Sequence, residues 1–409
     1  MVNFKNIAAT ATALFASGLA LPHKTSRAVP ENAIEGSYIV TLKSGDYDIA
    51  EHMGWVDGVY KRNLMKRGLN ERSYGGVGRT FSNFDGFRAY TGEFDDVTIA
   101  EIEGRDDVIS VEHDFVVTLS TVNGPIVNQT NAPWGLAAIS EGYPGAKTYS
   151  FDEDAGANTF AYVVDSGVMA RHEDFEGRVE VGYSVFKNES ADIDTLGHGS
   201  HVAGTSIGRK YGVAKKARAV AVKVFQGRNG SMAKILEGFD WAVEDILSKD
   251  RQNISVINLS LGGGLSFAFN EAVADATAAG ILTVAAAGND AEDSSLVSPA
   301  SAPSAITVGA VDKTWARWNM SNYGEPVDIY APGVGVLSVD ISSDTAASLK
   351  MGTSMAAPHV AGMALYAMSV HGITGPKAIT KHILENGLPG VVSGALKGSA
   401  NLMANLGEK

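Results

Sequence analysis

The chain has 409 residues, of which 45% are hydrophobic and 19% charged, with a formal net charge of −13 and no cysteine. This length and composition predict two or three soluble globular domains, and the acidic balance disfavours a nucleic-acid partner, which would need a basic face. Disulfides are excluded, so stability has to come from packing of a large core, and metal binding could substitute for crosslinks.

Residues 1–20 predict an export signal. Lys5 precedes the apolar stretch IAATATALFASGLAL, in which Gly18 and Ala20 are small residues suited to a signal peptidase. The stretch is too short and too diluted by Thr, Ser and Gly for a membrane anchor, which needs about 20 strongly apolar residues. We therefore expect a secreted protein with no membrane partner.

Residues 37–117 predict a small α+β domain. Strands are expected over 37–43, 77–84, 86–93 and 108–117, and helices near 46–63 and 96–105. The order strand–helix–strand–strand–helix–strand is the split βαβ, ferredoxin-like signature. Residues 119–133 are polar and turn-rich, which predicts an exposed, cleavable seam.

Beyond Ala132 the pattern changes to short apolar strands alternating with helices. The expected strands are 160–165, 217–225, 256–262, 281–289 and 305–311, with helices such as 234–247 between them. Such alternation predicts an α/β fold with a mostly parallel sheet covered by helices on both faces.

Three of these segments carry side chains that can do chemistry. FAYVVDSGV ends a strand at Asp165, LGHGSHVAG places His198 between glycines at the start of a helix, and VAAAGND ends a strand at Asn289. Active residues gather at the carboxyl ends of strands in parallel sheets. The imidazole has a pKa suited to proton transfer near neutrality, and the amide of Asn289 could meet a developing oxyanion.

GTSMAAPHVAG, residues 352–362, places Ser354 among the smallest side chains, on a turn into a helix expected over 355–370. A serine hydroxyl is a poor nucleophile unless a base takes its proton, the base is held in one tautomer and the oxyanion is stabilised. These roles fall to Ser354, His198, Asp165 and Asn289. Each residue taken singly also has a structural interpretation, as a helix cap, a satisfied core residue, a turn former or a loop cap.

Taken together, in the chain order Asp, His, Ser, these motifs resemble a subtilisin-family serine protease. APWGL, YGVAKKA, SLGGG, SPAS, SNYG and GTSMAAPHVAG are most similar to the proteinase K branch. The resemblance runs from about Ala132 to the C-terminus. It implies Ser354 as nucleophile, His198 as base, Asp165 as the residue that orients the base and Asn289 as oxyanion donor, with the Ser354 amide as second donor.

The domain that precedes the enzyme resembles, more loosely, the family's inhibitory propeptide. This implies a signal peptide over 1–20, a propeptide and seam over 21–126 and a catalytic domain over 127–409. It also implies self-cleavage between Ser120 and Asn128, after which the propeptide stays as an intramolecular inhibitor. We expect the mature enzyme to be a monomer.

In this family a peptide substrate lies as an extra strand between two backbone edges. The resemblance assigns one edge to Asn229, Gly230 and Ser231, and the other to Ser260, Leu261 and Gly262. It assigns the wall of the primary pocket to Ala286, Ala287 and Gly288. Small uncharged walls predict large apolar or aromatic side chains before the cut, and main-chain binding predicts broad specificity. The alternative for LGGGL is a flexible turn, and a phosphate loop is disfavoured because no GxGxxG or Walker pattern follows.

Calcium is the metal that the resemblance implies, because this hard cation accepts carbonyl and carboxylate oxygens. The implied ligands are the backbone oxygens of Pro303 and Ala305 and the carboxylate of Asp328. Asp328 could equally be a loop carboxylate that accepts from amides.

The sequence departs from the family at two positions, where Ser166 and Ser200 replace the usual threonines and keep a small hydroxyl. His172, His201 and His359 are expected to be structural. HEDFEG lacks the HExxH spacing of a zinc protease, and an α/β-hydrolase esterase would show GxSxG with its histidine last. A catalytically dead peptidase fold that only binds remains the second hypothesis, although no residue of the four roles is missing.

Overall fold

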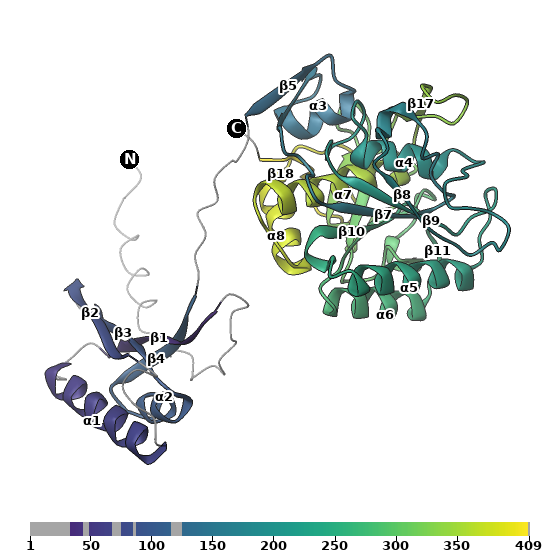
Figure 1. Cartoon of the computed structure of the whole chain (residues 1–409). Coiled ribbons are helices and arrows are strands. Elements are labelled where there is room, and N and C mark those ends of the chain that lie inside the picture. Colours follow the sequence, from purple (N-terminus) through teal and green to yellow (C-terminus); the bar gives the residue numbers. More distant parts are fainter. Residues whose placement is uncertain (1–32, 44–48, 68–74, 85–86, 116–124, 408–409) are drawn as a thin grey trace, which may run out of the picture. The chain divides into compact units, whose positions relative to one another are not determined.

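The computed structural model describes residues 33–43, 49–67, 75–84, 87–115 and 125–407. The chain forms two compact units, which divide between Leu119 and Ser120 (Figure 1). The predicted export signal and residues 119–124 of the predicted seam lie outside the described residues. Within the described ranges, no helix has the length and apolar character needed to cross a bilayer.

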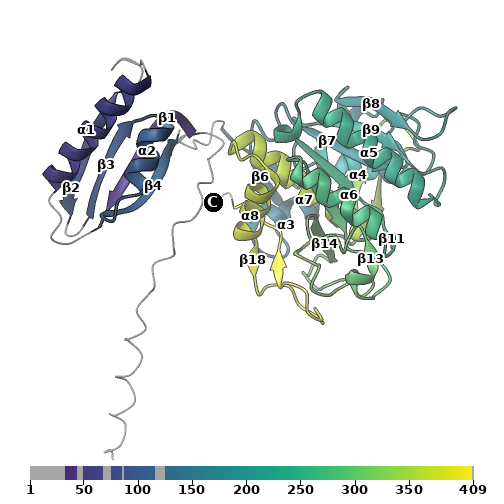
Figure 2. The ribbon, with the colours of Figure 1, turned by 90° about the horizontal axis from the view of Figure 1, so that it is seen from below.

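The first unit has the element order predicted from the sequence. Its elements are β1 (Ala33–Leu42), α1 (Ile49–Arg67), β2 (Gly76–Phe84), β3 (Phe87–Glu93), α2 (Asp96–Glu103) and β4 (Val108–Phe115). The strands form an antiparallel sheet in the order β2-β3-β1-β4, and both helices pack on one face of it (Figure 2). Tyr38, Tyr90 and Ile99 are buried between the sheet and the helices.

The second unit is built on a nine-stranded sheet in the order β18-β19-β15-β14-β12-β10-β7-β9-β8. Every pair in it is parallel except β18 with β19. The strands are β7 (Phe160–Asp165), β8 (Val179–Ser184), β9 (Arg218–Lys223), β10 (Ser255–Leu259), β12 (Leu282–Ala286), β14 (Ile306–Val311), β15 (Ile329–Pro332), β18 (Leu388–Pro389) and β19 (Leu402–Met403). Strands β10, β12 and β14 are buried along their whole length, as continuous apolar runs predict.

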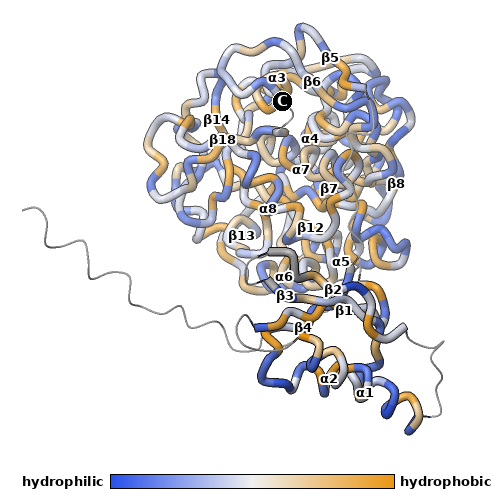
Figure 3. Tube along the Cα trace, turned by 90° about the vertical axis from the view of Figure 1, so that its left-hand side faces the viewer, coloured by the Kyte–Doolittle hydropathy of each residue, from blue (hydrophilic) through white to orange (hydrophobic). Residues whose placement is uncertain are grey.

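Helices cover both faces of this sheet. On one face lie α4 (His198–Ile207) and α7 (Thr353–Val370), and on the other α5 (Met232–Ser248) and α6 (Phe267–Ala278). The remaining helices are α3 (Trp134–Glu141) and α8 (Pro376–Asn386), with the short 3-10 helices η1 (Glu173–Phe175), η2 (Gln252–Ile254) and η3 (Ser294–Leu296). Figure 3 shows hydrophobic segments in the middle of this unit, around α7, and hydrophilic segments along its outside.

The smaller strands pair outside the main sheet. They are β5 (Ile126–Thr130) with β6 (Thr148–Asp152), β11 (Gly263–Gly264) with β13 (Val297–Ser298), and β16 (Val336–Val339) with β17 (Ala347–Lys350). The predicted seam therefore differs from the structure over residues 126–130, which form a strand. The side chains of β5 stay largely exposed, although that of Asn128 accepts from the hydroxyl of Ser150 and that of Gln129 donates to the carbonyl of Lys210.

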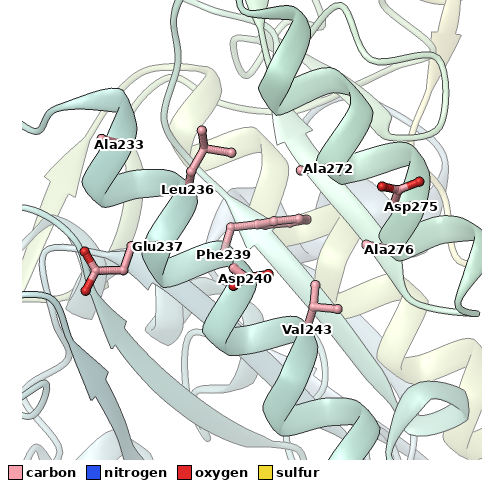
Figure 4. Close-up of a pocket in the computed structure, with 9 residues that line it drawn as sticks. All are labelled: Ala233, Leu236, Glu237, Phe239, Asp240, Val243, Ala272, Asp275 and Ala276. Carbon is pink, nitrogen blue, oxygen red and sulfur yellow. The ribbon is translucent and has the colours of Figure 1, made fainter.

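A groove of about 450 Å³ runs between α5 and α6 on the outer face (Figure 4). Leu236, Val243 and Ala272 give it an apolar floor, and Asp240 and Asp275 contribute carboxylates. The groove shares no lining residue with the pocket that holds Ser354.

Two buried histidines predict acid lability. Burial lowers the pKa of His359 to about 4 and that of His201 to about 3, although each ring donates to backbone carbonyls. In the unfolded chain both titrate near pH 6.5. The unfolded state therefore binds more protons below pH 6.5, and each histidine costs about 1.4 kcal/mol of stability per pH unit until its folded pKa is reached.

We expect the free energy of unfolding to fall steadily as the pH drops from 6.5 to 4. The measurement is urea unfolding at a series of pH values. His359→Gln lowers stability at pH 7 but makes the decline shallower. An unchanged slope in His359→Gln contradicts the assignment of the acid lability to this residue.

Candidate active site

The carboxyl end of β7 and the start of α4 bring an acid and a base together. Asp165 is the last residue of β7 and is 1% exposed, and His198 is the first residue of α4. The Nδ1 atom of His198 lies 2.8 Å from Oδ1 and 2.9 Å from Oδ2 of Asp165. Because a carboxylate only accepts, this contact places the proton on Nδ1 and leaves Nε2 as the basic nitrogen.

The residue after His198 has to be a glycine because a side chain at position 199 would clash with the end of β7. A Cβ atom at this position would lie 2.2 Å from the carbonyl oxygen of Gly167 and 3.1 Å from Cβ of Asp165. Helix α4 can therefore approach the end of β7 only with hydrogen at this position. The close approach is what brings the imidazole within reach of the carboxylate.

The surroundings of His198 set its basicity. Burial lowers the pKa of His198, but the charge and the hydrogen bond of Asp165 raise it, so that the net pKa lies above 6.5. Lys350 lowers the pKa and Asp194 raises it, both through their charges. The side chain is 28% exposed, so the imidazole remains open to a ligand.

Ser354 is the second residue of α7, which begins at Thr353, two residues earlier than the sequence predicts. Its hydroxyl donates to the carbonyl of Ser260 (3.1 Å), while the hydroxyl of Ser260 donates to the carbonyl of Ser354 (2.8 Å). Among the described residues the Ser354 hydroxyl makes no hydrogen bond with His198. The amide of Ser354 has no acceptor within the helix because it lies in the first turn.

The side chain of Asn289 is held by the residue beside the serine. Its Oδ1 accepts from the backbone amide (2.8 Å) and the hydroxyl (3.0 Å) of Thr353. These donors fix which end of the amide is oxygen, and Nδ2 has no acceptor among the residues that the structure describes. Asn289 and the amide of Ser354 therefore both offer free N–H groups in one pocket. Thr353 was missed in the sequence, although its hydroxyl beside the nucleophile is a signal that could have indicated it.

A pocket of about 220 Å³ opens beside Ser354 and Asn289. Of the predicted substrate-binding residues, its lining includes Leu261, Gly262, Ala286 and Gly288.

The lining does not include Ala287, which is fully buried in a separate apolar cluster with Trp315.

The pocket also carries charge, which the sequence interpretation did not include. Asp290 and Glu292 contribute to its lining, together with Val297 and the glycines of β11. Both acidic residues are exposed, and their backbone amides donate to Oδ1 of Asn322. The floor of the pocket is therefore apolar while its rim is negative.

The other predicted edge, Asn229 to Ser231, lies in the loop between β9 and α5. Asn229 forms an isolated bridge with Gln226, and the hydroxyl of Ser231 caps α5 by accepting from the amide of Lys234 (3.4 Å). None of the three residues lines the pocket beside Ser354. Their role as a substrate edge stays a prediction.

Of the predicted metal ligands, Pro303 and Ala305 lie just before β14, and Asp328 lies just before its parallel neighbour β15. Oδ2 of Asp328 accepts from the amide of Thr307 (2.8 Å), which is the alternative role foreseen for this carboxylate. Burial raises the pKa of Asp328 to about 6; the Thr307 hydrogen bond opposes this rise and the charge of Glu325 adds to it. Within the described part of the chain, no three His, Cys, Asp or Glu side chains cluster in a way that could hold a metal.

Comparison with known proteins agrees with this geometry. Residues 156–400 match the model of the subtilase family, and residues 37–120 match that of the peptidase inhibitor I9 family. The chain is 47% identical over 386 residues to alkaline protease 1 of Aspergillus clavatus, covering 94% of this chain and 93% of that protein. It is 46% identical over 414 residues to subtilisin-like proteinase Mp1 of Magnaporthiopsis poae, covering 99% and 98%.

Among solved structures, a cold-adapted subtilisin-like serine proteinase aligns with a TM-score of 0.62 and 36% identity. The alignment covers 67% of this chain and 98% of that one. This likeness places the fold of the matched part of the chain among subtilisin-like structures.

Proposed function

Because this chain belongs to the subtilase family and is a subtilisin-like serine protease with an I9 inhibitor domain, we propose a more specific function. It is a secreted endopeptidase of broad specificity that processes its own chain. The observation that carries the proposal is the contact of His198 with Asp165 at the end of β7, in a unit where Ser354 and Asn289 line one pocket. Its test is the loss of casein hydrolysis and of propeptide release in Ser354→Ala.

The proposed chemistry begins with a rotation of the Ser354 hydroxyl away from Ser260. Substrate binding brings the scissile carbonyl to Ser354, and Nε2 of His198 takes the hydroxyl proton as Oγ attacks the carbonyl carbon. Asp165 holds Nδ1–H and stabilises the imidazolium that forms. The imidazolium then gives its proton to the leaving amine, and the acyl-enzyme is hydrolysed by water through the same steps.

The negative oxygen of the tetrahedral intermediate needs donors that are already in place. We assign this role to Nδ2 of Asn289 and the amide of Ser354, which are the free N–H groups described above. Thr353 holds the amide of Asn289 through its oxygen, so little reorganisation is needed when the charge develops.

Removing this donor should lower the rate and leave binding intact. We expect Asn289→Leu to reduce kcat by about 10²- to 10³-fold, the loss known for this donor in subtilisin, with KM changed by less than about twofold because the donor acts on the transition state. Steady-state kinetics on a peptide anilide measure both constants. Asn322→Leu is the control, since Asn322 holds the neighbouring loop without offering a donor to the substrate. A rise in KM with unchanged kcat would contradict the assignment.

The apolar floor of the pocket supports cleavage after large apolar or aromatic residues. Leu261, Ala286 and Val297 leave room for such a side chain, and glycines let the substrate backbone approach. Main-chain binding along Ser260–Gly262 and Asn229–Ser231 supports tolerance at the other positions.

The first unit supports synthesis as a zymogen. Its match to peptidase inhibitor I9 ends at residue 120, and we propose that the enzyme cleaves its own chain between Ser120 and Asn128. The released propeptide then acts as an inhibitor of the mature enzyme, which works as an extracellular monomer on polypeptide substrates.

We also propose one structural calcium ion, the metal that subtilases generally bind. Oδ1 of Asp328 has no hydrogen-bond donor among the described residues, and burial raises the pKa of this carboxyl. These features fit a hard cation. Asp328 and the carbonyl oxygens of Pro303 and Ala305 would hold it, and its contribution is to crosslink the chain near β14 without taking part in the reaction.

Chelation should therefore lower thermal stability. At calcium of 100 times Kd the ion stabilises by about 2.7 kcal/mol, so we expect a chelator to lower Tm by about 5–10 °C. Differential scanning calorimetry on serine-blocked enzyme measures the shift. Asp328→Asn should abolish the chelator effect, whereas Asp340→Asn, which removes a loop carboxylate that accepts from the amide of Ser342, should retain it. Equal Tm values with and without chelator in the unmodified enzyme remove the site.

A further inference from the structure

Asp194 is a buried carboxylate that the mechanism above does not use. It is 8% exposed and lies four residues before His198. Its Oδ1 accepts from the hydroxyl of Ser166 (2.9 Å) and the amides of Leu196 (3.0 Å) and Gly197 (2.8 Å). Its Oδ2 accepts from the amide (2.9 Å) and the hydroxyl (2.7 Å) of Ser200.

These donors lie on both sides of the acid–base pair. Ser166 follows Asp165 at the end of β7, and its own amide donates to Oδ1 of Asp165 (2.7 Å). Ser200 is the third residue of α4, two after His198, and the hydroxyl of Ser166 also accepts from the amide of Gly199 (3.0 Å). One carboxylate therefore joins the strand that carries the acid to the helix that carries the base.

The same contacts cap α4. The helix begins after Gly197, which has no side chain to satisfy the first amides. The amide of Gly199 is satisfied by Ser166 and that of Ser200 by Asp194. Both caps come from outside the helix, so they fix where its first residue lies relative to β7.

All five partners of the carboxylate are donors. Only a group with two acceptor oxygens can satisfy them, because the nitrogen of an amide would point its own hydrogens at donors. The oxygens are also fully engaged, which leaves no demand for a bound cation. The chemistry of the cluster thus requires an ionised carboxylate at this position.

We propose that Asp194 is a positioning residue for the proton transfer, which holds His198 against Asp165 through the hydroxyls of Ser166 and Ser200. This inference rests on the proposed function of the triad. It accounts for the two departures from the family pattern, since both serines keep the hydroxyl that binds Asp194. A displacement of the imidazole by about 1 Å can cost about 10²-fold in rate.

The test is Asp194→Asn in the full chain, with kcat expressed per titrated active site after maturation. We expect kcat to fall about 10- to 100-fold while KM changes less than about twofold. The charges that face His198 are those of Asp165, Asp194 and Lys350, with His201 behind it. Removal of one negative charge should move the pH range over which kcat/KM increases to lower pH. The downfield proton resonance of His198 Nδ1–H should also shift.

Asp174→Asn is the matched control. Asp174 is also buried and accepts from loop amides, those of Lys210 (2.8 Å) and Tyr211 (3.4 Å), but it does not contact the triad. We expect it to lower Tm without changing kcat per active site or the pH dependence of kcat/KM. A purely structural role for Asp194 would give the same result in Asp194→Asn and would overturn the proposal.

The serine partners decide the question if Asp194→Asn does not mature. Ser166→Ala and Ser200→Ala should each lower kcat per active site, and Ser166→Thr and Ser200→Thr should restore it because they keep the hydroxyl. The proposal would be overturned if the alanine variants had the kcat and the pH dependence of kcat/KM of the unmodified enzyme. If the unmodified chain hydrolyses no substrate, the proposed function itself fails, and that outcome is distinct from either result above.

Discussion

Ser354→Ala abolishes both casein hydrolysis and release of the first unit, and the full-length chain persists on a gel. The alanine methyl group cannot attack a carbonyl, so no acyl-enzyme forms. In subtilisin, loss of this serine lowers kcat by about 10⁶-fold, and the remaining rate comes from the oxyanion donors and substrate binding. We expect a loss of the same order here, measured with a peptide anilide for hydrolysis and by gel electrophoresis for processing.

Ser248→Ala is the control for this experiment. Ser248 ends α5, where its exposed hydroxyl donates to the carbonyl of Asp245. We expect this variant to mature and to hydrolyse casein at the rate of the unmodified enzyme. If Ser354→Ala sheds its first unit at a normal rate in a protease-free host, self-processing by this serine is wrong. If the unmodified chain hydrolyses no casein, the result favours the alternative of a binding protein with a peptidase fold.

Asp165→Asn lowers kcat by about 10⁴-fold without dismantling the site. The amide matches the carboxylate in shape, but it can present N–H to Nδ1 of His198 and so stabilise the wrong tautomer, with the proton on Nε2. Loss of the acid in subtilisin costs a similar factor, smaller than loss of the serine or histidine. Kinetics per titrated active site measure the effect.

The pH profile of the same variant gives an independent reading. The base must be neutral to accept a proton, so kcat/KM of the unmodified enzyme rises with pH through the pKa of His198, which lies above 6.5. In Asp165→Asn the raising effects of the carboxylate are gone, and burial and Lys350 still lower the pKa. The rise of kcat/KM with pH therefore moves to lower pH in this variant.

Asp312→Asn serves as control for the profile, because Asp312 only accepts from its own loop, at Thr314. The rise of its kcat/KM with pH should coincide with that of the unmodified enzyme. A rise that stays in place in Asp165→Asn contradicts the direct contact of Asp165 with His198, even if kcat falls.

Each part of the site has a different origin in the chain. Asp165 and Asn289 follow apolar strands, and His198 and Ser354 lie at starts of helices made of small residues. Such segments are readable in the sequence because strands buried on both faces must be continuously apolar and because helices that approach a strand end must lack bulk. The parallel sheet and the ferredoxin-like first unit were predictable for this reason, and so were the strand ends and helix starts on which the four candidate residues lie.

Contacts between distant segments were not predictable in the same way. Ser354 and Ser260 exchange hydrogen bonds although they are 94 residues apart, and Ser166 reaches Asp194 across 28. Which side chains meet depends on the register and twist of the sheet and on rotamers chosen after packing. For the same reason the sequence did not predict that Glu292 lines the pocket or that Ala287 is buried in a separate apolar cluster.

The sequence by itself therefore determined the order of the elements, the two-unit organisation and the segments that carry the candidate catalytic residues, because these depend on hydrophobic period and local motifs. Tertiary structure alone decided that β5 pairs with β6, that Thr353 holds the amide of Asn289, and that Asp194 binds donors from both β7 and α4. These contacts come from chain segments that have no local reason to meet. They arise when the sheet closes around its core and buried polar groups must find partners.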